Sequence, residues 1–307
     1  MTRHELLQKI TTFPLVAEVL AEELLAGDLS SMFRGQGIEA DEVRRYQIGD
    51  DVRSIDWNVS ARFGTPYVKM YREERELSVY LCLDCSASMM CGSSMTRFEQ
   101  AALTVALIAF SAERFGERLG AVFFDKDISK FFSARRGRHN TLAVINEALN
   151  IAENSPPSFL THHNKRKKKD FSAKSNLKDA LSCLGRILKR RSLIVVVSDF
   201  FCMSWEQEMG RLCQRHDVIA VRITDPLDKQ LFKAGLIAME DPETGVRLHA
   251  PTNFSSFRSA WEAWHNDHSV SWKAILHRAG AASFELSTTD DTATSLIRFF
   301  RSRRRRR

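Results

Sequence analysis

From residue 77 onward the chain alternates between short apolar runs and longer amphipathic segments, and this alternation is the strongest constraint on the fold. Continuous apolar runs are typical of strands that helices cover on both faces. Residues 118–124 and 128–132 are separated by only three residues, too few for a crossover helix, and predict an antiparallel hairpin. The other expected strands are residues 77–83, 193–197, 217–223 and 282–286, and the expected helices are residues 97–114, 140–152, 177–189, 205–214, 257–279 and 292–301. The pattern therefore predicts an α/β fold with a doubly wound, mostly parallel sheet and one antiparallel edge strand.

The expected core domain spans residues 77–302 and includes a turn-rich insertion at residues 226–252. Residues 1–76 precede it as an extension that is helical at first and then irregular and rich in arginine and aspartate, and residues 303–307 form a basic tail. No apolar run reaches the ~20 residues needed to cross a bilayer, and the first residues are too polar for a signal peptide. We therefore expect a cytoplasmic protein.

The net charge of +7 arises from two local runs. One run is internal and consists of Lys165, Arg166, Lys167, Lys168 and Lys169, and the other is the five arginines at residues 303–307. Removing these ten charges from +7 leaves a slightly acidic body with a net charge of −3. Such runs are usually solvated, and they also attract acidic protein surfaces or nucleic acid.

Six cysteines are scattered along the chain, and Cys82 and Cys85 form a C-x-x-C pair. Pairs of this kind occur in zinc sites and in redox motifs. Cys82, however, lies inside an apolar run, and no second cysteine or histidine pair stands at zinc-finger spacing. We therefore interpret these thiols as buried structural residues.

A D-x-S-x-S sequence follows the first core strand and places Asp84, Ser86 and Ser88 in one tight loop. Asp199 ends a later strand, and Ser175 precedes a helix. Because the carboxyl ends of parallel strands meet at one edge of a sheet, these residues are expected to lie close together. Their oxygen atoms suit Mg²⁺, Mn²⁺ or Ca²⁺ rather than zinc. The five residues predict a metal site; the alternative is that they are ordinary helix and turn caps.

This set, with the hairpin that lacks a crossover helix, resembles the metal-ion-dependent adhesion site of von Willebrand factor A domains. In that family a DxSxS loop, a threonine and a later strand-end aspartate share the metal. The resemblance implies a von Willebrand factor A-like fold that holds Mg²⁺. Ser175 stands where threonine is usual, so it keeps the hydroxyl group but lacks the methyl group.

A second resemblance covers most of the chain and is to the domain-of-unknown-function 58 family. The motifs that carry it are residues 34–37 (RGQG), 44–57 (RRYQIGDDVRSIDW), 61–62 (AR), 225–226 (DP) and 241–245 (DPETG). Many members carry two transmembrane helices ahead of this region, and this chain lacks them. Members are commonly encoded beside MoxR-type AAA+ ATPases, so the resemblance implies a partner of that type.

The segment rich in arginine and aspartate is expected to form an ion-pair network that anchors the N-terminal extension to the core, because arginine–carboxylate pairs commonly order loops. A direct role in binding is the alternative. The residues of the expected network are Arg44, Tyr46, Asp50, Asp51, Arg53, Asp56, Trp57 and Arg62.

The leading functional hypothesis is a metal-dependent protein-interaction module, an adaptor or co-chaperone that acts with a MoxR-type ATPase. The internal basic run precedes Ser175 and is expected to favour an acidic partner. A metal-dependent hydrolase is one alternative, although the sequence contains no P-loop, H-E-x-x-H or G-x-S-x-G motif. Nonspecific nucleic-acid binding through the basic runs is another, although no aromatic residues are interleaved with them.

Overall fold

The computed structural model of the chain describes residues 43–69, 78–154 and 176–306, together with residues 5, 6, 8–10, 13, 17, 19 and 20. Its strands are β1 (Val43–Arg45), β2 (Tyr67–Lys69), β3 (Ser78–Asp84), β4 (Arg118–Phe124), β5 (Ile128–Arg135), β6 (Leu193–Ser198), β7 (Asp217–Thr224), β8 (Leu236–Glu240), β9 (Arg247–Pro251) and β10 (Ala282–Ser287). Its α-helices are α3 (Trp57–Phe63), α4 (Arg97–Arg114), α5 (Arg138–Asn154), α6 (Leu177–Ile187), α7 (Glu206–Cys213), α8 (Pro226–Lys229), α9 (Ser255–Ala279) and α10 (Thr292–Arg306), and two short 3-10 helices are η2 (Val52–Ser54) and η3 (Ala87–Met90).

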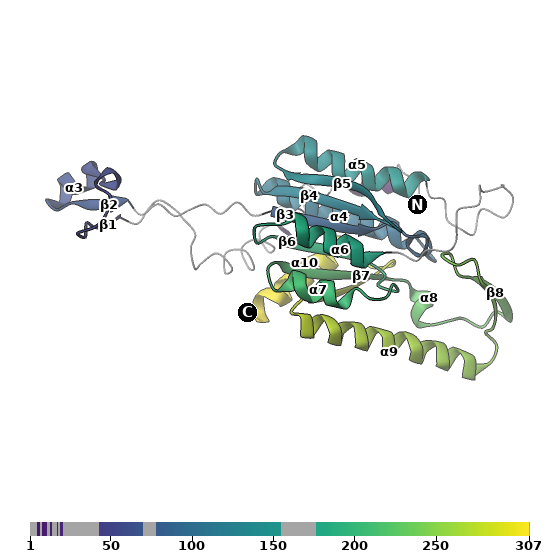
Figure 1. Cartoon of the computed structure of the whole chain (residues 1–307). Coiled ribbons are helices and arrows are strands. Elements are labelled where there is room, and N and C mark those ends of the chain that lie inside the picture. Colours follow the sequence, from purple (N-terminus) through teal and green to yellow (C-terminus); the bar gives the residue numbers. More distant parts are fainter. Residues whose placement is uncertain are drawn as a thin grey trace.

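Six strands form the central sheet in the order β10-β7-β6-β3-β4-β5 (Figure 1). Neighbouring strands are parallel from β10 to β4, and β5 runs antiparallel to β4. After β3 the chain adds β4 and β5 on one side of it. It then crosses to the other side of β3 and adds β6, β7 and finally β10. The switch point therefore lies between the carboxyl ends of β3 and β6, where ligands bind in sheets of this kind. The predicted fold class is confirmed.

Helices cover both faces of the sheet. Val79, Leu81 and Leu83 of β3 belong to one core cluster, with α4, α5 and α10, whereas Tyr80 and Cys82 belong to a second, with α6, α7 and α9. Successive residues of a strand point to opposite faces. A strand that is buried on both faces therefore requires the continuous apolar sequence seen here.

The described residues near the N-terminus contribute to the cluster that contains α4. They are Leu6, Ile10, Phe13, Ala17 and Leu20, all of them buried. Their spacing of three and four residues places them on one face of a helix. The start of the extension thus supplies apolar side chains to the core.

The C-terminal helix continues beyond residues 292–301, where the sequence placed it, to Arg306. The guanidinium group of Arg303 donates to both carboxylate oxygens of Asp217 at 2.6 and 2.7 Å, and both side chains are buried. Arg303 therefore belongs to the folded domain and not to a solvated tail. None of the helices among the described residues combines the length and the apolar character needed to cross a membrane.

Candidate metal centre

Asp84, the last residue of β3, is fully buried at the switch point of the sheet. Its Oδ1 accepts a hydrogen bond from the backbone N–H of Ser86 at 2.9 Å, and its Oδ2 accepts one from the hydroxyl group of Ser198 at 2.6 Å. Burial, followed by repulsion from Asp199, raises the pKa of Asp84 to about 7. The side chain is therefore held firmly in a place where its negative charge is costly.

Ser86 and Ser88 form the turn that follows Asp84. Their hydroxyl oxygens lie 3.1 Å apart, and Ser86 is buried whereas Ser88 is partly exposed. The carbonyl oxygen of Ser88 accepts a hydrogen bond from Arg97, whose guanidinium group also pairs with Asp228 at 2.5 Å. The first turn of α4 thus fixes the loop that carries the two hydroxyl groups.

Asp199 follows β6 directly and is 3% exposed. Its Oδ1 accepts a hydrogen bond from the backbone N–H of Phe201 at 3.1 Å, and its buried Oδ2 has no hydrogen-bond partner among the described residues. Phe200 adopts a left-handed conformation (φ 57°), which is uncommon for a bulky side chain. Its ring packs against Trp205 and Trp272, which holds this strained turn and with it the direction of the Asp199 side chain.

These residues fit a hard divalent cation. Asp84 ends β3 and Asp199 directly follows the adjacent strand β6. Repulsion from Asp199 contributes to the raised pKa of Asp84, and the buried Oδ2 atom of Asp199 has no hydrogen-bond partner among the described residues. Within the described parts of the chain, no three His, Cys, Asp or Glu side chains are arranged to hold a metal by themselves. A metal bound at this place would depend on two carboxylates and on serine hydroxyl groups, as oxygen-preferring cations allow.

Two groups of predicted site residues lie outside the described residues. They are Ser175, and Lys165, Arg166, Lys167, Lys168 and Lys169. Asn176, which follows Ser175, donates its backbone N–H to the carbonyl oxygen of Asp125 at 2.8 Å and caps α6. Asn176 therefore lies beside the turn between β4 and β5, which is at the same edge of the sheet as Asp84.

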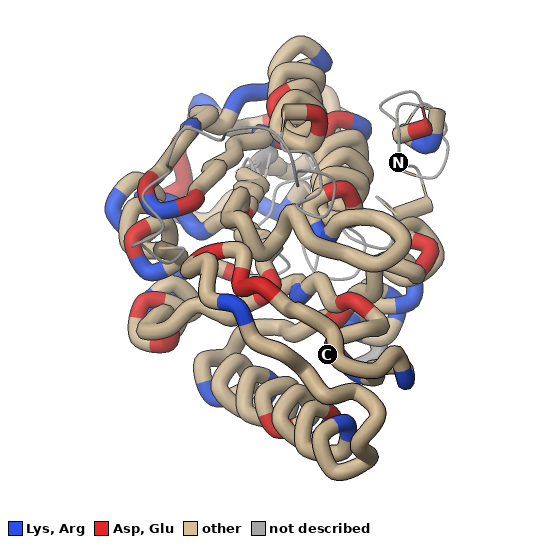
Figure 2. Tube along the Cα trace, turned by 90° about the vertical axis from the view of Figure 1, so that its right-hand side faces the viewer, with Lys and Arg blue, Asp and Glu red and all other residues tan. Residues whose placement is uncertain are grey.

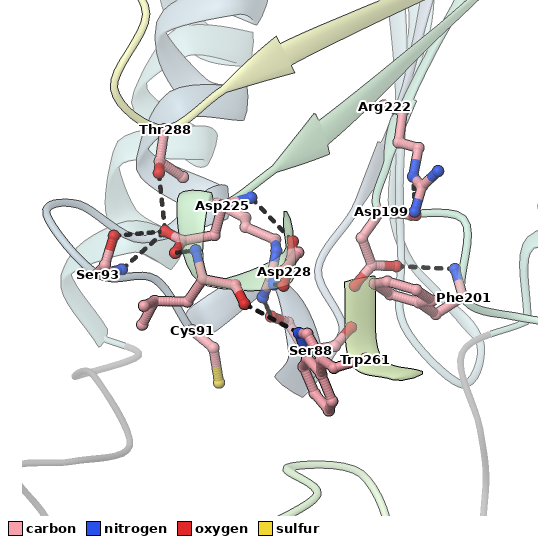
Figure 3. A network of polar contacts seen from close by, with 12 residues as sticks. Ser88, Cys91, Ser93, Asp199, Phe201, Arg222, Asp225, Asp228, Trp261 and Thr288 are labelled. Atoms are coloured by element: carbon pink, nitrogen blue, oxygen red, sulfur yellow. Dashed lines mark hydrogen bonds and ion pairs between the residues drawn. The ribbon is translucent and has the colours of Figure 1, made fainter. Parts of the chain in front are cut away.

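Asp225, which follows β7, links three loops at this edge (Figure 3). Its Oδ2 accepts hydrogen bonds from the backbone and the hydroxyl group of Ser93 and from the hydroxyl group of Thr288, at 2.8 to 2.9 Å. Burial alone would raise the pKa of Asp225, but these bonds and one from Leu227 lower it. The charged carboxylate of Asp225 thus connects the loop before α4, the start of α8 and the turn after β10 through hydrogen bonds.

Arg222 of β7 contacts the backbone of Asp199. Its Nε donates to the carbonyl oxygen of Asp199 at 3.2 Å, and its guanidinium group lies 5.3 Å from the ring centre of Phe201 and 3.6 Å from a carboxylate oxygen of Glu285 (Figure 3 shows Arg222 beside Asp199). This buried cation holds the backbone of Asp199. Among the described residues it donates no hydrogen bond to the Oδ2 atom of Asp199.

Sequence reasoning did not assign Arg97, Arg222, Asp225 or Glu243 to the site. Glu243 lies in the turn between β8 and β9 and is partly buried. Burial, followed by repulsion from Asp199, raises the pKa of Glu243. The one signal for Glu243 and Asp225 was that both lie in the motifs that carry the second family resemblance.

The segment rich in arginine and aspartate forms local structure within residues 43–69. Arg44 donates to both carboxylate oxygens of Asp50, at 2.7 and 2.5 Å. Asp51 caps η2, and Asp56 caps α3. Trp57 is 69% exposed, so it is not a buried centre for the expected network. Asp50, Asp51 and Asp56 accept hydrogen bonds from other residues of this segment. The anchoring of the extension to the core remains a prediction.

"Uncharacterized protein Rv1480" of Mycobacterium tuberculosis is 29% identical over 301 residues, which cover 96% of this chain and 89% of that protein. "Uncharacterized protein MAV169" of Mycobacterium avium is 29% identical over 133 residues, 43% of this chain and 78% of that protein.

Two solved structures are similar in fold at low sequence identity. BatB from Bacteroides thetaiotaomicron matches with a TM-score of 0.44 and 12% identity, covering 75% of this chain and all of that chain. The SpRpn10 VWA domain matches with a TM-score of 0.40 and 12% identity, covering 72% of this chain and 94% of that chain. The fold assignment itself stands on the strand order described above.

A family model described as "Protein of unknown function DUF58" matches residues 42–271. The match includes the Arg44–Asp50 pair, the loop after β3, Asp199, Asp225 and the turn that carries Glu243. It thus takes in the candidate site and, apart from residues 34–37, the motifs on which the resemblance was based. The chain belongs to the DUF58 family.

Proposed function

We propose that this protein is a metal-dependent protein-interaction module, whose binding rim is formed by the loop after β3 and the turn after β6. The observation that carries the proposal is the pair of buried carboxylates, Asp84 and Asp199, at the switch point of the sheet. Both are held by hydrogen bonds, and one oxygen of Asp199 has no such partner among the described residues. Two buried carboxylates that face one region favour a cation between them.

Asp84, Ser86, Ser88 and Asp199 would hold the metal, with Ser175 as a further candidate. A divalent cation bound mainly by hydroxyl groups and two carboxylates would remain electrophilic and accept an acidic side chain of a partner. Ser88 is the partly exposed member of the set and therefore lies where a partner can approach. Figure 2 views the molecule from the side of the β8–β9 hairpin and shows acidic residues near the middle of that face.

We propose a MoxR-type AAA+ ATPase, or another protein with an acidic face, as the partner. This rests on the family resemblance and on the internal basic run. Charged loops act mainly on the association rate and its salt dependence, whereas a desolvated contact acts mainly on dissociation. Neutralising Lys165, Arg166, Lys167, Lys168 and Lys169 is therefore expected to slow association and flatten its salt dependence.

The direct test measures the effect of Mg²⁺ or Mn²⁺ on the melting temperature. A ligand that binds only the folded protein raises the melting temperature, so wild type should be stabilised, whereas Asp84→Asn and Asp199→Asn should not. Asp127→Asn is the matched control, because Asp127 is an exposed carboxylate in the turn after β4, at the same edge of the sheet. Equal stabilisation of wild type and Asp84→Asn would contradict the metal site.

The same variants test the partner. Binding of a purified MoxR-type ATPase is measured by surface plasmon resonance with Mg²⁺ and with EDTA. EDTA and Asp84→Asn should both shorten the lifetime of the complex, and Asp127→Asn should not. If the lifetime is unchanged, we would conclude that any bound metal has only a structural role and that the partner binds elsewhere. Residues 43–69 would then be the next candidate surface.

A further inference from the structure

We propose that Trp264 of α9 is a second contact point for the partner and binds a large apolar side chain that lies close in sequence to the partner's metal-binding carboxylate. This inference rests on the metal-dependent binding proposed above. It specifies the chemistry of the partner, which is an acidic segment with a large apolar residue near the carboxylate. It also gives a role to an exposed aromatic side chain that the metal centre does not use.

Trp264 belongs to a group of rings that α9 and the turn after β6 form together. Its ring stacks on that of Phe201, with the planes at 9° and the ring centres 5.9 Å apart, and it lies nearly parallel to the ring of His268 at 5.9 Å. The ring of His265 stands perpendicular to it at 4.7 Å. Trp264 is nevertheless 55% exposed. An exposed ring that its neighbours already hold in one orientation loses little conformational entropy when a partner binds.

Phe201 connects this group of rings to the candidate metal centre. Its backbone N–H donates to Oδ1 of Asp199 at 3.1 Å (Figure 3), and its ring is the one on which Trp264 stacks. These two contacts in series place Trp264 within the reach of about four residues of extended chain from Asp199. One short segment of a partner can therefore contact the metal and Trp264 at the same time.

The charges around the rings favour an apolar side chain over a charged one. Burial lowers the pKa of His268 and lowers the pKa of His265 to about 4, so both imidazole groups are neutral at neutral pH. The guanidinium group of Arg222 already lies 5.3 Å from the ring centre of Phe201, which disfavours a second cation there. The faces of aromatic rings are negative and repel a carboxylate. Tryptophan side chains commonly anchor protein interfaces by packing against apolar groups.

The test selects binding segments without assuming the identity of the partner. A random peptide library displayed on phage is bound to the protein in the presence of Mn²⁺, and bound phage are then released with EDTA. We expect the released peptides to share an aspartate or glutamate, with a tryptophan, phenylalanine or leucine within about four residues of it.

Synthetic peptides from this selection are then tested against variants by fluorescence polarisation. Trp264→Ala should weaken binding by about 10- to 30-fold, because it removes an interface anchor, whereas Trp264→Phe keeps an aromatic ring and should retain most of the affinity. Val270→Ala is the matched control, because Val270 is 67% exposed on the same helix. Replacing the apolar residue of the peptide by alanine should weaken binding to wild type and have little further effect on Trp264→Ala.

The outcomes separate this inference from the function on which it rests. If peptides released by EDTA bind Trp264→Ala as tightly as wild type, Trp264 is not a contact, and the metal-dependent binding stands. If EDTA releases no peptide that Mn²⁺ retained, the metal-dependent function is wrong and this inference falls with it.

Two further measurements exclude other roles of Trp264. If Trp264→Ala also loses the increase in melting temperature that Mn²⁺ gives wild type, Trp264 only positions Asp199 through Phe201, and the inference is wrong. If Trp264→Ala changes the molecular mass in solution and leaves peptide binding unchanged, the ring contacts a second copy of the chain, and the inference is again wrong. Melting in EDTA verifies that each variant is folded.

Discussion

Replacing Asp84 by asparagine should make the metal-free protein more stable at neutral pH. The pKa of Asp84 is raised from 3.8 to about 7 in the folded protein. The folded state therefore binds this proton more tightly than the unfolded state does. The stability that the group contributes is fully present below about pH 4 and is lost as the pH rises to about 7. A difference of about three pKa units corresponds to about 4 kcal/mol.

The asparagine side chain carries no charge, so it avoids this loss. It can still accept from the N–H of Ser86, but its amide group cannot accept from the hydroxyl group of Ser198, which costs about 1 kcal/mol. Asp84→Asn should thus be more stable than wild type by about 3 kcal/mol at pH 8, and slightly less stable near pH 4.

The assay is urea unfolding of both proteins in excess EDTA at a series of pH values, with Asp127→Asn as the control. The informative quantity is the difference in free energy of unfolding between variant and wild type, because the contributions of all other titrating groups are the same in both proteins and cancel. A difference that does not change with pH would refute the reasoning about Asp84. Mn²⁺ at about 1,000 times its Kd should reverse the order, because it stabilises wild type by about 4.1 kcal/mol.

Three further predictions concern the fold. Arg303→Met should lower the free energy of unfolding by about 3 to 5 kcal/mol, because it leaves Asp217 buried without its ion-pair partner; urea unfolding measures this, and a loss below 1 kcal/mol would argue against a buried pair. Gly120→Ala should cost about 1 to 3 kcal/mol, because a Cβ atom there would lie 2.4 Å from the ring of Tyr80; an unchanged melting temperature would contradict that packing. Burial raises the pKa of the Cys82 thiol, so Cys82 should resist a thiol-labelling reagent until the protein unfolds, as peptide mapping of the labelled protein would check.

The alternation of strands and helices predicted the core well, because a strand between two helical layers must be apolar throughout, as β3, β6 and β7 are. The ends of some elements were less predictable. β5 continues to Arg135 and α10 continues to Arg306. The added residues are mostly polar or charged, a composition that is typical of solvent-exposed loops and tails. Arg303 is folded because Asp217, 86 residues away, supplies its partner, and no local pattern contains that information.

The candidate site was predictable to the extent that the sheet positions it. Asp84 ends one parallel strand and Asp199 directly follows another, so the rule for strand ends placed them together before the order of the strands was known. Glu243 was not predictable in the same way. It comes from a hairpin inserted after β7, and the direction in which such a hairpin folds back depends on contacts with residues far away in the sequence. The role of Arg222 was not predicted either, because it is a single charged residue within the apolar strand β7, and nothing in that local pattern indicates a contact with Asp199.

The place of β10 at the edge of the sheet has a consequence for how this chain can be divided. β10 covers the open edge of β7, and the helix after it supplies Arg303 to Asp217. A fragment that stops after α9 would present the unpaired N–H and C=O groups of β7 to solvent, and such edges pair readily with other chains. It would also remove Thr288 from Asp225. Fragments for binding studies should therefore extend at least through Arg303, because a shorter fragment would be expected to aggregate.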